Sequence, residues 1–228
     1  MEENYRHELK YQIGPAEYFA IRQRLRPVMK ADEHAGPDGR YLIRSIYFDN
    51  ADDKALREKI DGVQKREKWR IRYYNDDFSF ITLEKKMKVN SLCMKFDAEL
   101  SETECRAILN GNTEWMMEHR SPLVRELYCK MKSQQLRPKV LVSYIREPYV
   151  FEAGNVRVTF DSQIRTSLYQ QEFLSKNVQD ISATDRPQDM VLEVKYDAFL
   201  PEIIEALLQT EGIRQQAFSK YGACRRFG

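Results

Sequence analysis

Cysteine is scarce in this sequence of 228 residues. The only four are Cys93, Cys105, Cys129 and Cys224, and none forms a C-x-x-C pair with another. This spacing argues against a zinc ribbon, a thioredoxin-type motif and a dense disulfide framework. We therefore expect four reduced thiols.

Other chemical signatures are missing as well. The three histidines, at positions 7, 34 and 119, do not have metal-ligand spacing, and the sequence contains neither H-E-x-x-H nor G-x-x-x-x-G-K-[ST]. A zincin or a Walker-type ATPase is therefore not expected. No window approaches eighteen apolar residues, and the N-terminus, MEENYRHELKY, lacks a basic region followed by an apolar run. We expect neither a membrane span nor a signal peptide, and the simplest compartment is the cytoplasm.

Neither sign of charge is in large excess. Lys and Arg number 37 and Asp and Glu 35, for a net charge of +2. Nothing like a basic coat for nucleic acid is implied, so we expect no nucleic-acid partner. Any cationic site must come from a local concentration of charge. A chain with 32% charged and 11% aromatic residues is typical of a folded protein, and its length suits a single domain spanning residues 1–228.

Alternation of polar and apolar residues dominates the chain and predicts about eight strands. The alternating segments are 6–13, 42–49, 68–74, 79–88, 94–100, 139–151, 156–164 and 190–197. An Asn-Asp-Asp turn at 75–77 predicts an antiparallel hairpin. Segments 31–40 and 170–189 are predicted loops.

Four segments between the strands carry helix-start signals. Pro15, Pro122 and Pro201 occupy first-turn positions, and Ser101 with Glu104 forms a capping box. The predicted helices lie at 14–30, 100–111, 121–136 and 200–212, with Phe19, Ile21 and Leu25 on one side of the first. The fold class is α+β, with helices inserted into a mainly antiparallel sheet.

The polar faces of these strands are unusually cationic. In KREKWRIRYY (65–74), the residues Arg66, Lys68, Arg70 and Arg72 share one face. Such a face can meet water on an open sheet or line the lumen of a closed barrel, and alternation alone favours the open sheet. However, cations spaced two apart repel one another unless an anion lies among them. Isolated carboxylates among the cations suggest a bridging divalent metal, so polyphosphate with a metal ion satisfies both features.

Eight short motifs then carry a family resemblance. They are RHELKY, SIYFDN, WRIRYY, LEKKMK, SYIREPY, VRVTFD, LEVKYD and FSKY, in this order along the chain. Each is weak alone, but the ordered set is specific. From about residue 5 to 225 the chain resembles the VTC-type polyphosphate polymerase domain, which belongs to the triphosphate tunnel metalloenzymes of the CYTH-like superfamily.

The resemblance implies an antiparallel eight-stranded β-barrel tunnel with flanking α-helices and basic walls. It implies transfer of the γ-phosphate of ATP to a growing inorganic polyphosphate chain inside the tunnel. Carried over by position, the catalytic phosphate contacts are Lys10, Arg70, Arg72, Lys86, Arg146 and Lys220, and the further substrate contacts are Lys95, Tyr144, Arg157, Lys195 and Ser219. Glu193 is the expected principal ligand of Mn²⁺ or Mg²⁺, with Glu8 and Glu84 as secondary ligands.

Two departures from the family pattern bear on activity. The first strand reads Arg6-x-Glu8-x-Lys10 rather than E-x-E-x-K, which argues against a small triphosphatase or a class IV adenylyl cyclase. Ala217 stands where yeast-like members carry a lysine, so one phosphate contact is expected to be absent. A metal-dependent triphosphatase and a non-catalytic polyphosphate-binding module remain as alternatives. Arg66 and Lys68, near the start of their strand, are expected only at the tunnel entrance.

Overall fold

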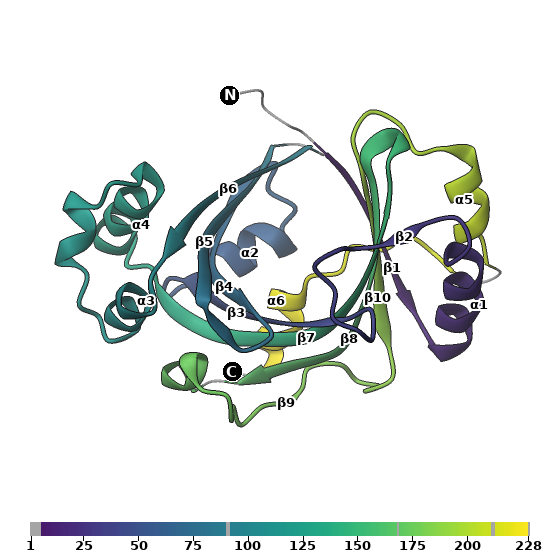
Figure 1. Cartoon of the computed structure of the whole chain (residues 1–228). Coiled ribbons are helices and arrows are strands. Elements are labelled where there is room, and N and C mark those ends of the chain that lie inside the picture. Colours follow the sequence, from purple (N-terminus) through teal and green to yellow (C-terminus); the bar gives the residue numbers. More distant parts are fainter. Residues whose placement is uncertain (1–5, 90–91, 168, 211–212, 228) are drawn as a thin grey trace.

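A single ten-stranded antiparallel sheet organises the protein (Figure 1). The structure is a computed structural model that describes residues 6–89, 92–167, 169–210 and 213–227. The order along the main path is β1-β10-β8-β7-β3-β4-β5-β6, and the short strands β2 and β9 pair with β7 and β8. The strands are β1 His7–Ile13, β2 Lys30–Ala31, β3 Tyr41–Asp49, β4 Lys65–Tyr74, β5 Asp77–Val89, β6 Leu92–Leu100, β7 Arg137–Phe151, β8 Val156–Ser167, β9 Ile181–Ser182 and β10 Met190–Tyr196.

The sheet curls until its two edge strands meet. An isolated antiparallel bridge joins Arg6, just before β1, to Cys93 in β6. Figure 1 shows the long strands of the sheet curving round toward one another. The predicted antiparallel tunnel with flanking helices is therefore confirmed. Its seam is a local contact between the edges, so the sheet is curled rather than hydrogen-bonded continuously around the tunnel.

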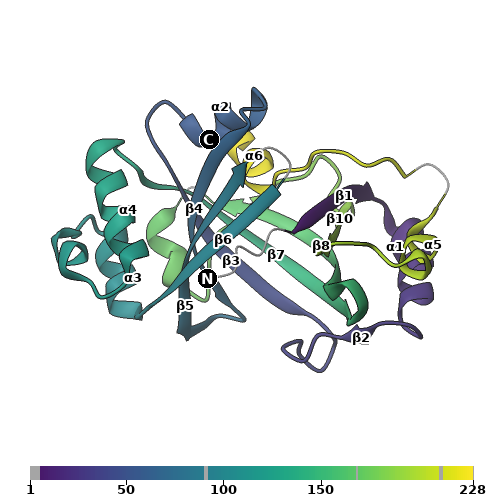
Figure 2. The same cartoon turned by 90° about the horizontal axis from the view of Figure 1, so that it is seen from above.

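Two pairs of helices cover the outer, apolar face of the sheet on opposite sides (Figures 1 and 2). Helices α1 (Pro15–Leu25) and α5 (Glu202–Leu208) pack on β8 and β10, where Ile21 and Ile204 are buried beside Phe160 and Leu192. Burial of this apolar surface holds the helices to the outside of the tunnel.

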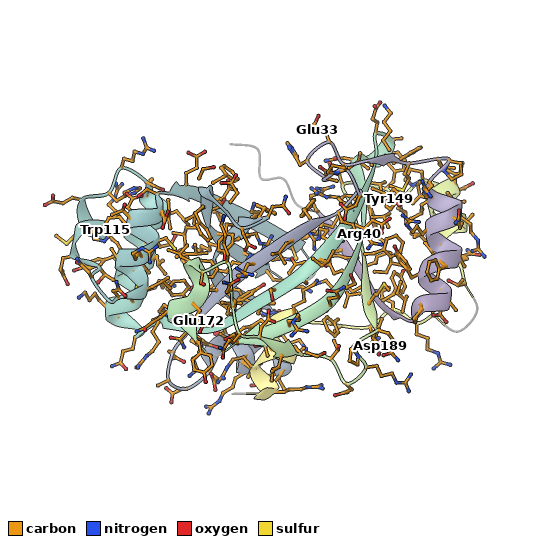
Figure 3. The ribbon with its side chains drawn as sticks, turned by 60° about the horizontal axis from the view of Figure 1, so that its bottom comes forward. Glu33, Arg40, Trp115, Tyr149, Glu172 and Asp189 are labelled. Carbon is orange, nitrogen blue, oxygen red and sulfur yellow. The ribbon has the colours of Figure 1, made fainter. Side chains whose placement is uncertain are left out.

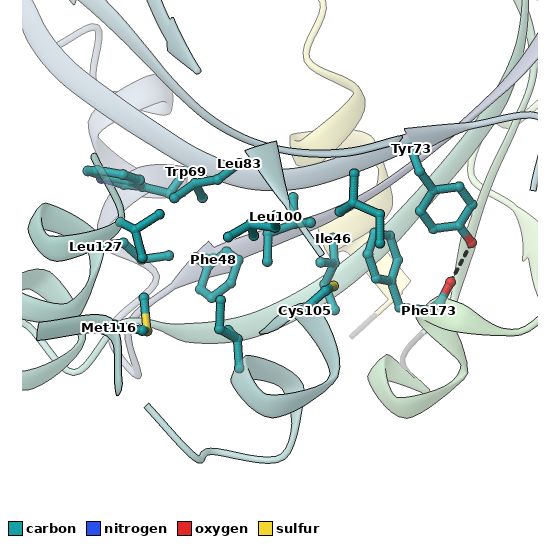
Figure 4. Packing of buried hydrophobic residues seen from close by; sticks show 14 of the residues in the cluster. Ile46, Phe48, Trp69, Tyr73, Leu83, Leu100, Cys105, Met116, Leu127 and Phe173 are labelled. Atoms are coloured by element: carbon teal, nitrogen blue, oxygen red, sulfur yellow. Dashed lines mark hydrogen bonds between the residues drawn. The ribbon is translucent and has the colours of Figure 1, made fainter. Parts of the chain in front are cut away.

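Helices α3 (Glu102–Leu109) and α4 (Pro122–Ser133) pack on the other side of the molecule. Figure 4 shows their core, in which Trp69 and Leu83 from the sheet face Leu127 and Met116 from the helical side. The other helical turns are α2 Lys54–Ile60, α6 Lys220–Cys224 and the 3₁₀ turns Glu114–Glu118, Ala153–Asn155, Gln170–Leu174 and Arg225–Phe227.

A buried acid on the outer face has partners of its own. Glu147 in β7 is only 4% exposed and accepts hydrogen bonds from the hydroxyl groups of Tyr18 and Tyr149, each at 2.6 Å, and from Arg22 Nε at 2.6 Å. Arg40 also reaches this carboxylate, and Figure 3 shows Arg40 near Tyr149 beside α1. This network therefore helps to fix α1 to the sheet.

Helices α2 and α6 differ from the other four because they lie at one end of the tunnel (Figure 2). Asp49, at the end of β3, is fully buried and accepts hydrogen bonds from the backbone N–H groups of Ala55 and Leu56 in α2. The same carboxylate accepts the hydroxyl proton of Tyr221 in α6 at 2.5 Å, and the Tyr221 ring stacks on Tyr47 with centroids 5.2 Å apart. One acid thus anchors both helices.

Most of the predicted elements occur, with a few corrections. The first helix ends at Leu25 rather than near residue 30, because Pro27 cannot continue it. Phe19 was expected on the buried side of this helix, but its side chain is 59% exposed, and the neighbouring Tyr18 is buried instead. The hairpin turn is reduced to Asn75 and Asp76, both with positive φ.

Further differences lie in the connecting segments. Helix α2 and the inward helix α6 were not predicted, and β9 lies in a predicted loop. The predicted stop of the last long helix, Gly212, lies outside the described residues.

All four cysteines are free, as expected. Within the described segments, no helix has the length and apolarity needed to cross a membrane.

Candidate functional site

The charged faces of the strands point into the tunnel and are buried there. Arg72 is 5% exposed, Glu84 2%, Asp161 0% and Glu193 4%. The alternative of a sheet whose charged face meets water is therefore wrong for these strands. Buried charges are stable only when they are paired or bound to an ion. The ion pairs inside the tunnel therefore indicate which kind of ligand it can bind.

One side of the tunnel, which we call the arginine wall, consists of inward side chains from β3 to β6. Its members are Ser45, Tyr47, Arg70, Arg72, Glu84, Lys86 and Lys95. They are brought level by the antiparallel register, which sets Arg70 opposite both Tyr47 and Glu84. Each strand thus contributes alternate residues to one surface.

Glu84 is the anchor of the arginine wall. Arg70 pairs with Glu84 through Nε and Nη2, and Lys95 Nζ lies 3.0 Å from the other carboxylate oxygen. Arg72 Nε donates to Ser45 Oγ at 3.0 Å, and Arg72 Nη2 donates to the hydroxyl of Tyr144 at 3.1 Å. Both guanidinium groups are thus oriented, and each can present a planar pair of donors to phosphate.

The cations of this wall change the acidity of their neighbours. Burial alone would raise the pKa of Glu84, but Arg70, Arg72 and Lys95 outweigh it and hold that pKa well below the ordinary value. Burial would also raise the pKa of Tyr47, yet Arg70 and Arg72 lower it. The wall therefore has a strongly positive local potential.

The opposite side, which we call the carboxylate wall, combines acids and bases. Its members are Glu8, Lys10, Tyr144, Arg146, Asp161, Glu193 and Lys195, joined by Lys220 from α6. Arg146 binds Asp161 through two hydrogen bonds of 2.7 and 2.8 Å, and Lys220 Nζ lies 2.5 Å from the same carboxylate. Asp161 thus orients two cations toward the lumen.

Glu193 lies among four cations on this wall. Lys195 Nζ is 2.8 Å from Glu193 Oε1, whereas Arg146 and Lys220 are 3.7 and 3.8 Å from Oε2. Burial alone would raise the pKa of Glu193. The nearby ammonium groups of Lys195, Lys10 and Lys220 have the larger effect and hold this pKa well below its ordinary value. In turn, burial lowers the pKa of Lys10, but Glu193 and Glu8 more than offset this and raise it. Glu193 is therefore an anion at neutral pH.

Besides the hydrogen bond from Arg72 to Tyr144, an ion pair joins the two walls. Lys86 Nζ lies 2.9 Å from both carboxylate oxygens of Glu8, and Lys10 Nζ lies 3.5 Å from Glu8 Oε2. Lys195 Nζ is also within 3.8 Å of Glu8. The pair joins β1 to β5 across the seam between the edge strands β1 and β6, so it helps to keep the curled sheet closed.

Ten of the fourteen predicted site residues lie in the central part of the two walls. They are Glu8, Lys10, Arg70, Arg72, Glu84, Tyr144, Arg146, Glu193, Lys195 and Lys220. Lys86 and Lys95 lie at its edge, and the Lys95 side chain is 52% exposed. Arg157 lies apart, paired with Asp32 at 2.6 Å and with the Tyr41 hydroxyl at 2.8 Å. Ser219 caps α6 by accepting the Gly222 N–H at 3.1 Å.

The acids of the carboxylate wall suit a divalent metal only in company with phosphate. Among the described residues, no three His, Cys, Asp or Glu side chains are grouped as a metal site. Mg²⁺ and Mn²⁺ need only one or two carboxylates when phosphate oxygens complete the shell. Glu193 and Glu8, which flank Lys195, fit that requirement. Glu84 lies on the other wall among three cations, and its role as a secondary ligand stays a prediction.

Two residues that orient the arginines were not predicted as site residues. Ser45 and Tyr47 lie in the SIYFDN motif, but no role was assigned to either of them. Their position opposite Arg72 and Arg70 depends on the pairing of β3 with β4. Lys68 was expected at the tunnel entrance, and its ammonium group lies 3.2 Å from Ser219 Oγ, at the end of the tunnel where α6 lies. Contacts of this kind join residues more than twenty positions apart, so alternation within one strand cannot find them.

Comparison with known proteins identifies the architecture. Among solved structures, a proposed adenylate cyclase from Bacillus halodurans is 16% identical with a TM-score of 0.52, and the match covers 92% of this chain and 88% of that one. A proposed adenylate cyclase from Vibrio parahaemolyticus is 9% identical with a TM-score of 0.51, covering 97% of this chain and 98% of the other. At these identities the likeness shows the fold alone.

Family membership comes from the sequence itself. No curated protein matches the chain. The VTC domain pattern, however, matches residues 5–227, which is nearly the whole of the sequence. The resemblance carried by the eight ordered motifs is thereby confirmed, and the protein belongs to the VTC domain family.

Proposed function

We propose that the protein is a metal-dependent polyphosphate polymerase that transfers the γ-phosphate of ATP to a growing inorganic polyphosphate chain. The observation that carries the proposal is the division of the tunnel into two walls. Arg70 and Arg72 are oriented as phosphate donors, and Glu193 faces them across the lumen as an ionised acid. Membership of the VTC domain family supports a phosphate-chain substrate.

Phosphoryl transfer needs positioning and neutralisation more than covalent chemistry from the protein. A terminal oxygen of the polyphosphate chain attacks the γ-phosphorus, the bond to the β-phosphate oxygen breaks, and ADP leaves with the electron pair. Arg70 and Arg72 hold the equatorial oxygens on one side, and Arg146 and Lys220 hold those on the other. Asp161 and Glu84 keep these cations in place.

A divalent ion would complete this arrangement. Proteins of this tunnel class generally depend on a divalent metal, and here Glu193, with Glu8, would hold Mn²⁺ or Mg²⁺. When bound, the metal supplies additional neutralisation of charge on the phosphate oxygens. Lys195, Arg146 and Lys220 would keep these two carboxylates ionised and in place for the ion.

A product assay tests the proposal. Purified protein is incubated with ATP and Mn²⁺ or Mg²⁺, and the products are separated on a gel and assayed for free phosphate. Long polyphosphate chains are the expected product. Free phosphate without chains would instead identify a triphosphatase, and tight polyphosphate binding without turnover would identify a binding module. The predicted cytoplasmic location would supply ATP as the donor.

A further inference from the structure

An open pocket of about 510 Å³ lies on the outer face of the sheet, away from the tunnel lumen. Its floor is formed by β3, β7 and β8, and one wall by residues 176–180, which lead to β9. Arg44, Ser143 and Arg165 lie level across the floor, because the antiparallel register sets Ser143 opposite both arginines. Arg44 precedes Ser45, whose side chain points into the tunnel, so the Arg44 side chain points outward into the pocket.

The guanidinium group of Arg44 is held by the protein at one nitrogen only. Its side chain is only 7% exposed, and Nη1 donates to the hydroxyl of Tyr73 at 2.8 Å, to Asp76 Oδ1 at 2.7 Å and to the backbone oxygen of Ser175 at 2.8 Å. Nε is buried and has no acceptor among the described residues. No acceptor for Nη2 is found in the described segments either.

The two unpartnered nitrogens of Arg44 form one edge of the guanidinium plane. Parallel N–H groups of this kind bind two oxygens of a phosphate or a carboxylate together. A buried donor without an acceptor destabilises a folded protein. The contacts of Nη1 fix Arg44 in place, but they leave this edge without a partner, so the missing acceptor is expected to come from a ligand.

The wall of the pocket is fixed to its floor in advance. Asp180 Oδ2 accepts a hydrogen bond from Ser143 Oγ at 2.8 Å, and Asp180 Oδ1 accepts one from Arg165 Nε at 2.5 Å. Arg165 Nη2 also donates to the backbone oxygen of Asp180 at 2.7 Å. At the neighbouring residue, the Gln179 N–H donates to Glu172 Oε2 at 3.0 Å. A ligand therefore meets a wall that is already ordered, which lowers the entropic cost of binding.

The charge of the lining favours a dianion. Arg44, Arg165 and Lys176 line the pocket with a single acid, Asp180, which leaves two positive charges. Asp76 meets Arg44 at Nη1 and is not part of the lining. A phosphate monoester carries a charge of about −1.5 to −2 at pH 7, whereas a single carboxylate carries only −1. The phosphate monoester therefore matches the lining better.

The pocket also has room for more than a phosphate group. Its volume lies within the range of small-molecule sites, roughly 300–1,000 Å³. Leu42, Ile145 and Val178 supply apolar lining, and Gln163 supplies an amide. Gln163 has a φ of 49° and lies where the register of β7 and β8 shifts, between Ser143 and Ile145. Such β-bulges are over-represented next to functional sites, because they redirect a side chain.

We propose that this outer pocket is a second ligand site, which binds the phosphate group of a small phosphate monoester. Nε and Nη2 of Arg44 are its paired donors, and Lys176 is a further cation. The organic part of the ligand lies against the apolar lining. The site is on the opposite face of the sheet from the tunnel, and it does not depend on the proposed function.

The experiment must separate this pocket from the tunnel, since both have cations. Backbone amide chemical shifts of the full chain are therefore followed by NMR while glycerol 3-phosphate is added at millimolar concentration. We expect shifts at residues 163–165 and 176–180, and their concentration dependence gives the affinity of the pocket. The amides of residues 70–72 report separately on binding in the tunnel.

Two variants of the pocket and one matched control test its donors. Arg44→Lys keeps the charge but lacks the paired donors, so the affinity at the pocket amides should fall about tenfold. Lys176→Glu changes an exposed residue, which keeps the fold intact, and should lower that affinity about threefold. Lys30→Ala removes a cation that is 79% exposed on β2 and should have no effect.

The outcomes that contradict the proposal are distinct. If the pocket amides do not respond to glycerol 3-phosphate, or if Lys176→Glu binds it as tightly as the wild type, the pocket is not a phosphate site. Unchanged affinity of Arg44→Lys would exclude the paired donors. Equal or tighter binding of glycerate, a carboxylate of similar size, would overturn the assignment to a phosphate monoester. A tunnel that does not respond to tripolyphosphate would count against the proposed function alone.

Discussion

The two walls of the tunnel differ in how many acids balance their buried cations. On the arginine wall, Glu84 is shared by Arg70, Arg72 and Lys95, so donor groups outnumber the acceptors that hold them. On the carboxylate wall, Asp161 and Glu193 are each surrounded by cations at close range. The first wall therefore has donors to offer to phosphate, and the second has acids that can hold a metal ion.

The largest expected effect comes from removing the central acid of the carboxylate wall. Glu193→Gln should lower the turnover of ATP by roughly 100-fold or more, because a bound metal contributes several kcal/mol to the transition state. Affinity for tripolyphosphate should remain within a few-fold, since the arginine wall is intact. Turnover and calorimetry measure the two effects, and Glu205→Gln, an exposed acid on α5, is the matched control. Unchanged turnover would remove Glu193 as metal ligand.

A converse effect is expected on the arginine wall. Arg70→Ala or Arg72→Ala should weaken tripolyphosphate binding by roughly 10- to 100-fold, because hydrogen bonds between charged groups contribute about 1.5–3 kcal/mol. Lysine at either position should restore only part of the loss, because it lacks the planar pair of donors. Arg106→Ala, which removes an exposed cation from α3, should have no effect. If all these variants bound tripolyphosphate as tightly as the wild type, the arginine wall would not be the phosphate-binding side of the tunnel.

The acidity of Glu84 gives the arginine wall a pH signature. Because the pKa of Glu84 in the folded protein is below its ordinary value of 4.5, its contribution to stability is complete above that pH. The contribution is lost as the pH falls from 4.5 toward the folded pKa. Glu84→Gln should therefore unfold more easily than the wild type at pH 7, and the difference should shrink toward pH 3. Urea unfolding measures this, and a constant difference would contradict it.

The smallest effect is expected outside the tunnel. The Ser101 hydroxyl caps α3 by accepting a hydrogen bond from the Glu104 N–H at 3.2 Å, and the Glu104 carboxylate accepts one from the Ser101 N–H at 2.8 Å. Ser101→Ala should lower the free energy of unfolding by about 1 kcal/mol. It should leave phosphate binding unchanged, because α3 packs on the outer face. Urea unfolding and calorimetry test both parts; altered binding would show that the outer helices shape the tunnel.

Local patterns predicted much of this architecture. Alternation placed Arg70 and Arg72 on one face, and Pro15 and the Ser101 capping box located helix starts that the structure confirms. These features depend on residues only two to four positions apart, which is why they can be read directly. The C-terminal end of α1 was predicted too late, because the stop signal of Pro27 was not used. The exposure of Phe19 was not predicted, because packing decides which side of a helix is buried.

The long-range contacts could not be predicted in the same way. Glu8 and Lys86 are 78 positions apart, and Tyr221 reaches Asp49 across 172 positions. Nothing near Ser219 or Lys68 in the sequence indicates that they touch. Their meeting requires the C-terminal segment to enter the curled sheet, which no local pattern encodes.

The order of strand residues assigned each charged side chain to a face, because neighbouring side chains on a strand must point in opposite directions. Alternation could not choose between a charged face in water and one inside a tunnel. Curling of the sheet decided that, because it turned the polar face inward while the helices buried the apolar one. The same curling brought the arginines and carboxylates to opposite sides of one lumen.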